Sequence, residues 1–242
     1  MTLSGKRLTN GKDYTLSYSN NKKPGTATVT VTGTGAYTGQ VSVNFKISDS
    51  AKLKYRVHAQ TYGWMNWMTG GNAAGTTGES KRLESIRLKV ENTGYSGNIE
   101  YCTQVQTYGW QDWVQNGAES GTTGQSKRLE AIRIRLTGEL ADHYDIYYRV
   151  HSQTYGWMGW AKNGAKAGTK NLGKRVVSYQ VQLKKHGSSA PGYDNLSYVT
   201  SGDSGAKKLA MRAKIYNKAS DTKYTIVCST SYNKVAIFKG TK

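Results

Sequence analysis

The sequence predicts an all-β chain, and three observations favour that fold class. The 242 residues include 28 Gly, 18 Tyr and 6 Trp but only 2 Pro and 2 Phe, a composition typical of strands joined by tight turns. A unit with the same spacing of Trp, Gly and Tyr occurs three times along the chain. Within the units, apolar and polar residues alternate with a period of two, which indicates strands with one buried and one wet face. We therefore expect several small β modules rather than one large domain.

The central region consists of three copies of one unit, at residues 55–90, 101–136 and 148–183. The first Trp of each copy stands at 64, 110 and 157, so the period is 46 and then 47 residues, and all six Trp of the protein lie in these copies. A unit this small cannot bury its own apolar face, whereas three units around a pseudo-threefold axis can. The sequence therefore predicts a closed three-repeat block of the β-prism or β-trefoil type.

The copies share the pattern Tyr-x-x-His/Gln-x-Gln, Gly-Trp, Trp, Asn/Gly, Gly-Thr-x-Gly and Arg-Leu-Glu-x-Ile, in this order. The pattern resembles the clostridial hydrophobic (ChW) repeat, which is named for its Trp. The resemblance covers residues 55–183 and implies a module of secreted and surface proteins that binds the wall or the cell surface. The third copy departs from the pattern, because Val176-Val177 replaces the Leu-Glu pair and Asn171 replaces the second turn glycine. If the acidic residue contributes to a ligand site, the third site is impaired.

Residues 1–48 contain two alternating segments, 26–32 and 41–47, separated by a Gly-rich turn. They resemble the second half of a bacterial immunoglobulin-like surface repeat. A complete sandwich of that type needs about seven strands, and this segment offers at most four, so we expect a partial β-sandwich. Residues 184–208 are dominated by Gly, Ser and Lys without periodicity, which predicts a linker.

Residues 209–242 carry a hairpin pattern, with strands expected near 224–227 and 233–238. This pattern resembles the first hairpin of an L,D-transpeptidase catalytic domain, which implies a peptidoglycan-remodelling parent protein with its catalytic Cys and His beyond Lys242. Cys228 lies at a position that is usually acidic in that family, so it is no candidate for the nucleophile. Reading the gene past Lys242 for a Ser-His-Gly-Cys-like motif would separate such an enzyme from a pure binding protein.

The chain itself offers no pattern that predicts catalysis, a metal site or a cofactor. His58 and His151 occupy one repeat position that is Gln104 in the second copy, and an amide cannot serve as a general base near neutral pH. Cys102 and Cys228 have no paired spacing that signals a zinc or redox site, and whether they form a disulfide stays open. We therefore expect a non-enzymatic chain.

The net charge of the chain indicates which class of binding partner it attracts. The 34 basic residues against 15 acidic ones give a net charge of +19, of which only +5 lies in residues 55–183. A basic chain with many aromatic residues fits nucleic-acid binding, but no helix-turn-helix, finger or RNA-binding signature accompanies it. Anionic wall polymers are the better electrostatic partner.

The surroundings of the protein are predicted from its ends and its apolar runs. No apolar run approaches the roughly 20 residues of a membrane span. The start of the chain shows no signal peptide, which leaves a cytoplasmic protein or a piece of a longer secreted one. The family resemblance favours the second, an extracellular, wall-associated protein whose signal peptide is missing from this fragment.

The two Trp of each copy are predicted to have different roles. The first Trp follows a Gly and is expected to fill the space where the three units meet. The second lies between polar residues and is expected to form an exposed platform, because an indole face stacks on a sugar ring or a cation. A Lys-Arg pair at one repeat position would supply a threefold ring of positive charge. The core set is Trp64, Trp110 and Trp157; the platforms are Trp67, Trp113 and Trp160; the basic pairs are Lys81, Arg82, Lys127, Arg128, Lys174 and Arg175.

These residues predict up to three weak sites for a cell-wall polymer, either peptidoglycan or teichoic acid, that act together because tethering raises avidity. An adhesin for host or environmental glycans is the alternative, since sugar stacking looks alike whichever glycan is bound. The third site is expected to be the weakest, because it lacks the acidic residue that would orient the neighbouring Arg.

Overall fold

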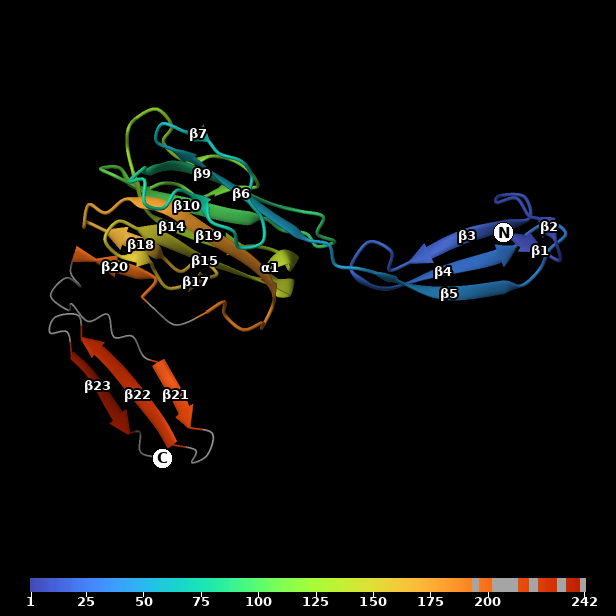
Figure 1. Ribbon diagram of the computed structural model, residues 1–242. Coiled ribbons are helices and arrows are strands. Elements are labelled where there is room, and N and C mark those ends of the chain that lie inside the picture. The colour runs from blue at the N-terminus through green and yellow to red at the C-terminus, as the bar shows by residue number, and fades with distance from the viewer. Residues whose placement is uncertain (193–195, 202–212, 218–221, 230–233, 240–242) are drawn as a thin grey trace. The chain divides into compact units, whose positions relative to one another are not determined.

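The computed structural model describes residues 1–192, 196–201, 213–217, 222–229 and 234–239 (Figure 1). Its elements are strands, apart from one short helix, α1 (Glu139–His143). The predicted all-β class is therefore confirmed. No described helix is long and apolar enough to cross a membrane. The chain divides into two compact units, one formed by Met1–Ala51 with Asn92–Ser96 and one by Lys52–Glu91 with Gly97–Lys242.

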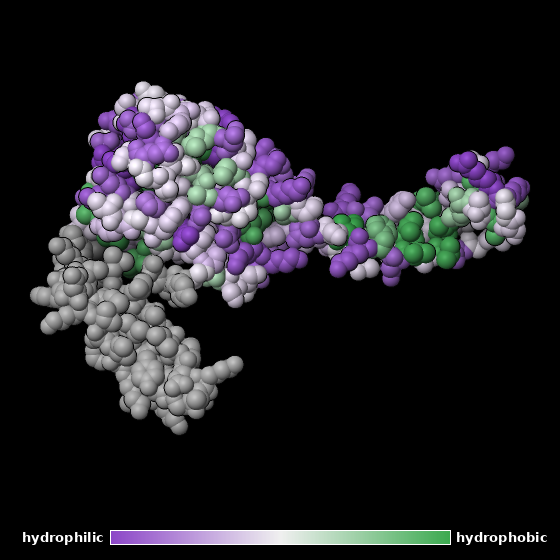
Figure 2. All heavy atoms as spheres, in the orientation of Figure 1, coloured by the Kyte–Doolittle hydropathy of each residue, from purple (hydrophilic) through white to green (hydrophobic). Residues whose placement is uncertain are grey.

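The first unit is a single antiparallel layer with one apolar face. A small hairpin, β1 (Thr2–Leu3) and β2 (Lys6–Arg7), precedes three paired strands, β3 (Tyr14–Ser19), β4 (Gly25–Gly33) and β5 (Gln40–Ile47), so the strands predicted at 26–32 and 41–47 are confirmed. The register places Tyr18, Val29 and Val43 in one row across the sheet. Val43 is 55% exposed, and apolar side chains gather on the visible surface of this sheet (Figure 2).

Each repeat of the second unit is built on a long antiparallel hairpin. The hairpins are β6 (Lys52–Ala59) with β9 (Leu83–Glu91), β10 (Ile99–Val105) with β14 (Leu129–Leu136), and β15 (Tyr144–Ser152) with β19 (Val176–Lys185). A two-residue strand that contains the first Trp folds back on each hairpin: β7 (Gly63–Trp64), β11 (Gly109–Trp110) and β16 (Gly156–Trp157). Two further short strands, β12 (Val114–Gln115) and β17 (Ala161–Lys162), extend this pairing in the second and third repeats.

A third short strand in each repeat pairs with the preceding repeat and closes a ring. These strands are β8 (Ala74–Gly75), β13 (Ser120–Gly121) and β18 (Ala167–Lys170). Strand β13 of the second repeat pairs with β9 of the first, β18 of the third with β14 of the second, and β8 of the first with β19 of the third. This cyclic exchange fits the predicted pseudo-threefold block. Its three separate sheets favour the prism-like alternative.

The exchange depends on one glycine per repeat. Gly121 has a φ of +119°, and a Cβ atom added to it would lie 2.4 Å from the carbonyl oxygen of Glu84 in the neighbouring repeat. The equivalent glycines, Gly75 and Gly168, meet their neighbours in the same way at 2.4 and 2.3 Å. A side chain therefore has neither the backbone conformation nor the space that it needs at these positions.

The centre of the block is filled by tyrosines and aliphatic side chains. Tyr55, Tyr101 and Tyr148 are fully buried, one in each repeat, and each hydroxyl donates a hydrogen bond to a backbone carbonyl of its own repeat. Burial of the ring raises the pKa of Tyr55 to about 12. Tyr179 joins this cluster, with its ring centroid 5.4 Å from that of Tyr55. A buried Tyr needs such a hydrogen bond because an unpartnered hydroxyl in the core is costly.

The predicted linker is in part a structural element. Residues 198–200 form strand β20 (Tyr198–Thr200), which pairs in parallel with β18, so the linker expectation is wrong for this stretch. The Gly, Ser and Lys around this strand dominate the composition, so the strong β propensity of the short Tyr-Val-Thr run is easily overlooked.

The C-terminal strands form an antiparallel sheet. It contains β21 (Ala213–Asn217), β22 (Thr222–Ser229) and β23 (Lys234–Lys239). The predicted hairpin is confirmed as the pairing of β22 with β23, and β21 adds a third strand to it.

Candidate binding surfaces of the three repeats

A stack of Trp rings and basic side chains lies on the outer face of each hairpin. In the first repeat, the guanidinium carbon of Arg56 is 4.8 Å from the ring centroid of Trp64 and 4.7 Å from that of Trp67. Arg87 lies 4.5 Å from Trp64, and Lys89 lies 5.0 Å from Trp67. The Arg56 guanidinium thus contacts both rings, and Arg87 and Lys89 each add a cation to the stack.

The other two repeats keep the shared arginine but take it from different strands. In the second repeat, Arg133 of β14 lies 5.9 Å from Trp110 and 5.0 Å from Trp113. In the third, Arg149 of β15 lies 4.8 Å from both Trp rings. The positions face each other across the hairpin: the opposing pairs are Arg56 with Arg87, Cys102 with Arg133, and Arg149 with Gln180. An arginine between the two Trp rings is therefore retained even where one strand has lost it.

The prediction that the first Trp of each copy fills the centre of the block is wrong. Trp64, Trp110 and Trp157 are half-buried, and the core consists of other residues. The pairing of His58 with Trp64 places Trp64 on the same outward face as His58, and the two rings meet edge to face at 5.6 Å. The apolar positions of the central strand, such as Tyr55 and Val57, point inward instead.

The predicted platforms are also half-buried rather than open. Trp67, Trp113 and Trp160 each have a guanidinium near one ring face, and the remaining ring surface is the part that a ligand can reach. Arg56, Arg133 and Arg149 complete these arrays and are not among the residues predicted from the sequence. A signal was present, because the second copy has Cys at the position of Arg56 and keeps an Arg on the strand that faces it.

The arginine of the first two predicted basic pairs is held by a buried carboxylate. Arg82 donates to Glu84 with its Nη2 at 2.7 Å and its Nε at 2.9 Å, and Arg128 contacts Glu130 at 2.8 Å. Glu84 is only 5% exposed, and its other oxygen lies 3.0 Å from Nδ1 of His58. These guanidinium groups are therefore partly neutralised by their own repeat.

The third repeat lacks this carboxylate, because Val177 stands in its place. The Nε atom of Arg175 and the Nδ1 atom of His151 are buried and have no hydrogen-bond partner within the described part of the chain. Burial lowers the pKa of His151 below its ordinary value of 6.5. The third repeat thus keeps the two basic side chains of this cluster without their acid.

The structure does not bring the second Trp and the Lys-Arg pair together within one repeat. Trp67 packs beside Arg56 and Lys89, whereas Lys81 and Arg82 precede the start of β9. Lys89 lies seven residues beyond Arg82, which corresponds to roughly 20 Å along a strand. The two halves of the predicted site are therefore separate surfaces on one hairpin.

An exposed tyrosine marks the end of the hairpin that carries the basic pair. Tyr62 is 54% exposed, and its hydroxyl donates to the carboxylate of Glu79 in the loop that leads to β9. Tyr108 is the equivalent residue, and the ammonium of Lys127 lies 5.5 Å from its ring centroid. In the second repeat this tip combines an aromatic ring with the lysine of the pair, whereas the sequence pattern predicts that lysine beside the second Trp.

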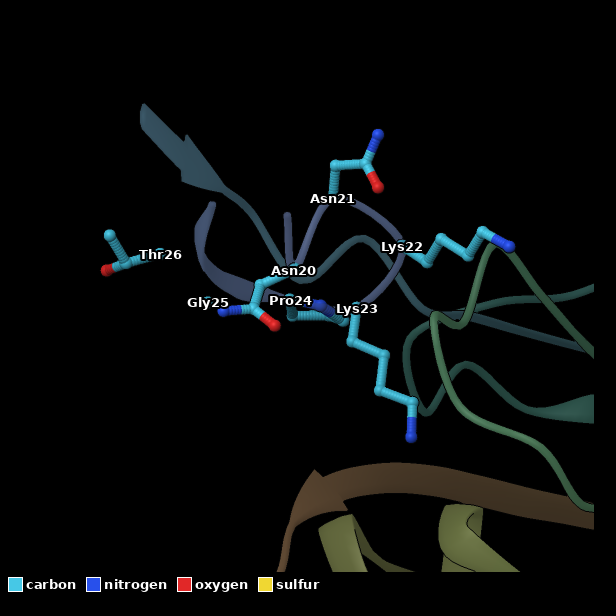
Figure 3. Close-up of a pocket in the computed structure, with 7 residues that line it drawn as sticks. All are labelled: Asn20, Asn21, Lys22, Lys23, Pro24, Gly25 and Thr26. Carbon is cyan, nitrogen blue, oxygen red and sulfur yellow. The ribbon is translucent and has the colours of Figure 1, made fainter. Parts of the chain in front are cut away.

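The first unit contains an open hollow of about 520 Å³. It is lined by consecutive residues, Asn20 to Thr26, so it is the inside of one loop rather than a cleft between elements. Figure 3 shows the side chains of Lys22 and Lys23 leaving the loop in different directions. The loop gathers no set of converging groups that a ligand would need.

Within the described ranges, no group of three or more His, Cys, Asp or Glu is placed to hold a metal ion. Cys102 is a free, buried cysteine, and burial raises the pKa of its thiol to about 11. A thiol with such a pKa is protonated at neutral pH and is a poor nucleophile.

Comparisons with known proteins show what the three repeats are similar to. No curated protein sequence and no solved structure matches the chain. A family model described as Clostridial hydrophobic W matches residues 58–92, 104–138 and 151–185. Each segment begins in the first strand of one hairpin and ends at its second strand or up to two residues beyond it, so each structural repeat matches the family model once.

Proposed function

We propose that this chain is a non-catalytic surface-binding region of an extracellular, wall-associated protein, and that its three repeats bind a wall polymer. The observation that carries the proposal is the stack of half-buried Trp rings and basic side chains on each repeat. An indole edge that stays accessible beside a cation suits a sugar ring with an anionic substituent. Three weak copies on one rigid block would add their affinities through avidity.

The basic pairs belong to the same proposal as a second contact surface. Lys81, Lys127 and Lys174 recur at one position of the ring of repeats, and a polyanion such as teichoic acid is long enough to touch several of them. The net charge of +19 supports attraction of a polyanion over distance. The proposal includes a parent protein that the repeats hold at the wall. The resemblance of residues 1–48 to an immunoglobulin-like surface repeat and of residues 209–242 to the start of an L,D-transpeptidase domain is consistent with such a parent.

The test is retention of the full chain on purified cell walls before and after removal of teichoic acids. A triple variant, Lys81→Gln with Lys127→Gln and Lys174→Gln, is expected to lose at least tenfold of its retention on intact walls. The matched control removes the same charge from exposed lysines of the first unit, Lys12, Lys22 and Lys46, and is expected to bind like the parent. Equal loss in both variants would mean that net charge alone acts, and no loss in either would contradict the proposal for the basic pairs.

The aromatic contribution is tested separately. Trp67→Ala with Trp113→Ala is expected to lower retention on walls with or without teichoic acid, while circular dichroism reports whether the fold persists. Equal binding to host-type or plant glycans immobilised at the same density would favour the adhesin alternative, because an indole platform does not distinguish glycans by itself.

A further inference from the structure

The third repeat carries a strand from a later part of the chain that the first two repeats lack. Strand β20 adds in parallel to β18, with Gly168 opposite Tyr198 and Thr169 opposite Val199. The Gly159 N–H donates to the Leu196 carbonyl at 3.0 Å, and the Gly168 N–H donates to the Ser197 carbonyl at 2.7 Å. Residues 196–200 therefore lie in a groove between the segment after the first Trp and the outer edge of β18.

Among the described residues, no strand covers the same groove in the first and second repeats. Strands β8 and β13, which correspond to β18, are the outer strands of their sheets within the part of the chain that the structure describes. Gly159 is buried beneath the added strand, whereas the equivalent Asn66 and Asp112 are exposed. Met158 is 5% exposed in the third repeat, and its counterparts Met65 and Gln111 are only half-buried.

The chemistry of the groove selects an extended polypeptide. A sheet edge offers alternating N–H and C=O groups at the spacing of a second β-strand, which a peptide backbone matches and a sugar chain does not. The strand that already occupies the third groove fixes the direction and the register of pairing. It also shows a side-chain contact, because the ammonium of Lys166 lies 5.3 Å from the centroid of the Tyr198 ring.

The rims of the open grooves differ at the position of Lys166. Ala73 stands there in the first repeat and Glu119 in the second. The Glu119 carboxylate is bonded by the Ser85 hydroxyl at 2.8 Å and by Arg87 at 3.0 Å. The first groove is therefore free of charge at this point and suits an aromatic or aliphatic side chain.

We propose that the open grooves of the first and second repeats are docking sites for an extended segment of a partner protein, one that carries a Tyr next to β-branched residues. The segment adds a parallel strand to β8 or β13 as residues 196–200 add to β18. This inference goes beyond polymer binding, since it uses the sheet edges rather than the Trp stacks or the basic pairs. A three-residue strand contributes few hydrogen bonds, so a single groove binds with a Kd on the order of 1 mM, and two grooves on one block act together.

The test uses the isotope-labelled full chain and a capped synthetic peptide with the sequence of residues 196–201, Leu-Ser-Tyr-Val-Thr-Ser. Titration to about 5 mM, several times the expected Kd, is followed by NMR of the backbone amides. Saturable shifts are expected at Asn66 and Gly75 and at Asp112 and Gly121. The amides of the third groove are expected to stay unchanged, because the chain's own strand occupies it. No saturable shift in the first two grooves, or shifts in the third groove alone, would overturn the proposal.

Two variants sharpen the result. Asp112→Pro removes the N–H that corresponds to the Gly159 donor and is expected to weaken binding at the second groove at least tenfold, whereas Asp112→Ala keeps the N–H and binds like the parent. Val199→Pro removes an N–H of the chain's own strand that a parallel ladder uses, and it is expected to release the third groove so that Gly159 and Gly168 respond to the peptide. If Asp112→Pro fails to fold, the Val199→Pro result decides: a released groove that ignores the peptide contradicts the proposal.

Discussion

The first two repeats and the third repeat share one scaffold and differ in what surrounds it. In all three, a glycine approaches the neighbouring repeat, a tyrosine fills the centre, and an arginine lies between two Trp rings. The third repeat alone lacks the buried glutamate and carries an added strand at its edge. Residues that close the ring thus stay fixed, while the surface chemistry varies from copy to copy.

The arginine between the Trp rings is kept by exchange between strands. The first repeat has Arg on both opposing positions, the second only Arg133 and the third only Arg149. Each repeat therefore keeps a cation between its two indoles, but the strand that supplies this cation differs between repeats. Variants in which one repeat is given the residues of another therefore test which differences matter.

The largest effect is expected at the glycines that close the ring. Gly121→Ala puts a Cβ atom about 2.4 Å from the Glu84 carbonyl oxygen, at a φ of +119°, and we expect a loss of at least 3 kcal/mol in the free energy of unfolding. The matched control is Gly124→Ala, which has a φ of +75° and no atom within 4 Å, and it should cost only about 1 kcal/mol. Urea unfolding followed by tryptophan fluorescence measures both. Equal costs would mean that the close contact between repeats does not limit stability.

A smaller effect is expected from the shared arginine. Arg133→Gln removes the guanidinium shared by both Trp rings of the second repeat and is expected to cost about 1 kcal/mol, measured by the urea midpoint. Arg56→Gln should cost less, because Arg87 still contacts Trp64 and Lys89 still contacts Trp67. Arg133→Gln, by contrast, leaves Arg135 beside Trp113 but removes the cation beside Trp110.

The double variant Cys102→Arg with Arg133→Gln reproduces the arrangement of Arg149 and Gln180 in the third repeat. It is expected to recover the part of the stability that comes from the Trp stack, but not the bond that the Arg133 Nε–H donates to the Gly164 carbonyl of the third repeat at 2.9 Å. A double variant that is no more stable than Arg133→Gln alone would show that the two strands are not interchangeable as the source of the arginine.

Much of this architecture could be predicted from the sequence because repetition reports on the fold directly. The 46- and 47-residue period indicates the three units, and the alternation of Ile132 and Ile134 with Arg133 and Arg135 identifies an inner and an outer face. The pairing of β8, β13 and β18 with neighbouring repeats could not be predicted from the sequence. Each of these strands is short, and closure of the ring determines which strand it pairs with.

The site was harder to predict because residue type was a poor guide to burial. Trp usually marks a core, yet the six Trp lie on the outer face, and Tyr55, Tyr101 and Tyr148 fill the centre. The tyrosines fit there because a backbone carbonyl accepts each hydroxyl. The Trp rings stay outside because the strands that carry them pair with outward positions such as His58 and His151.

The smallest effect is expected where the third repeat differs by one carboxylate. Val177→Glu places an acid where Glu84 stands in the first repeat, near the Nε atom of Arg175 and the Nδ1 atom of His151, which have no hydrogen-bond partner among the described residues. We expect the free energy of unfolding at pH 8 to change by less than 1 kcal/mol, since the cost of burying the carboxylate and its attraction to Arg175 oppose each other.

The pH dependence of that variant is the sharper result. In the parent, burial holds the pKa of His151 below 6.5, so the unfolded chain takes up a proton first and stability falls as the pH drops below 6.5. A neighbouring carboxylate is expected to raise the folded pKa of His151 above 6.5. Protonation then favours the folded state, and the added stability is present below pH 6.5 and lost as the pH rises through the new pKa.

NMR titration of the His151 ring together with urea midpoints at pH 5.5 and 8 measures both effects. Val177→Gln is the matched control, because it has the same size without the charge. If Val177→Gln raises the pKa of His151 as much as Val177→Glu, the missing acid does not account for the difference between the third repeat and the first two.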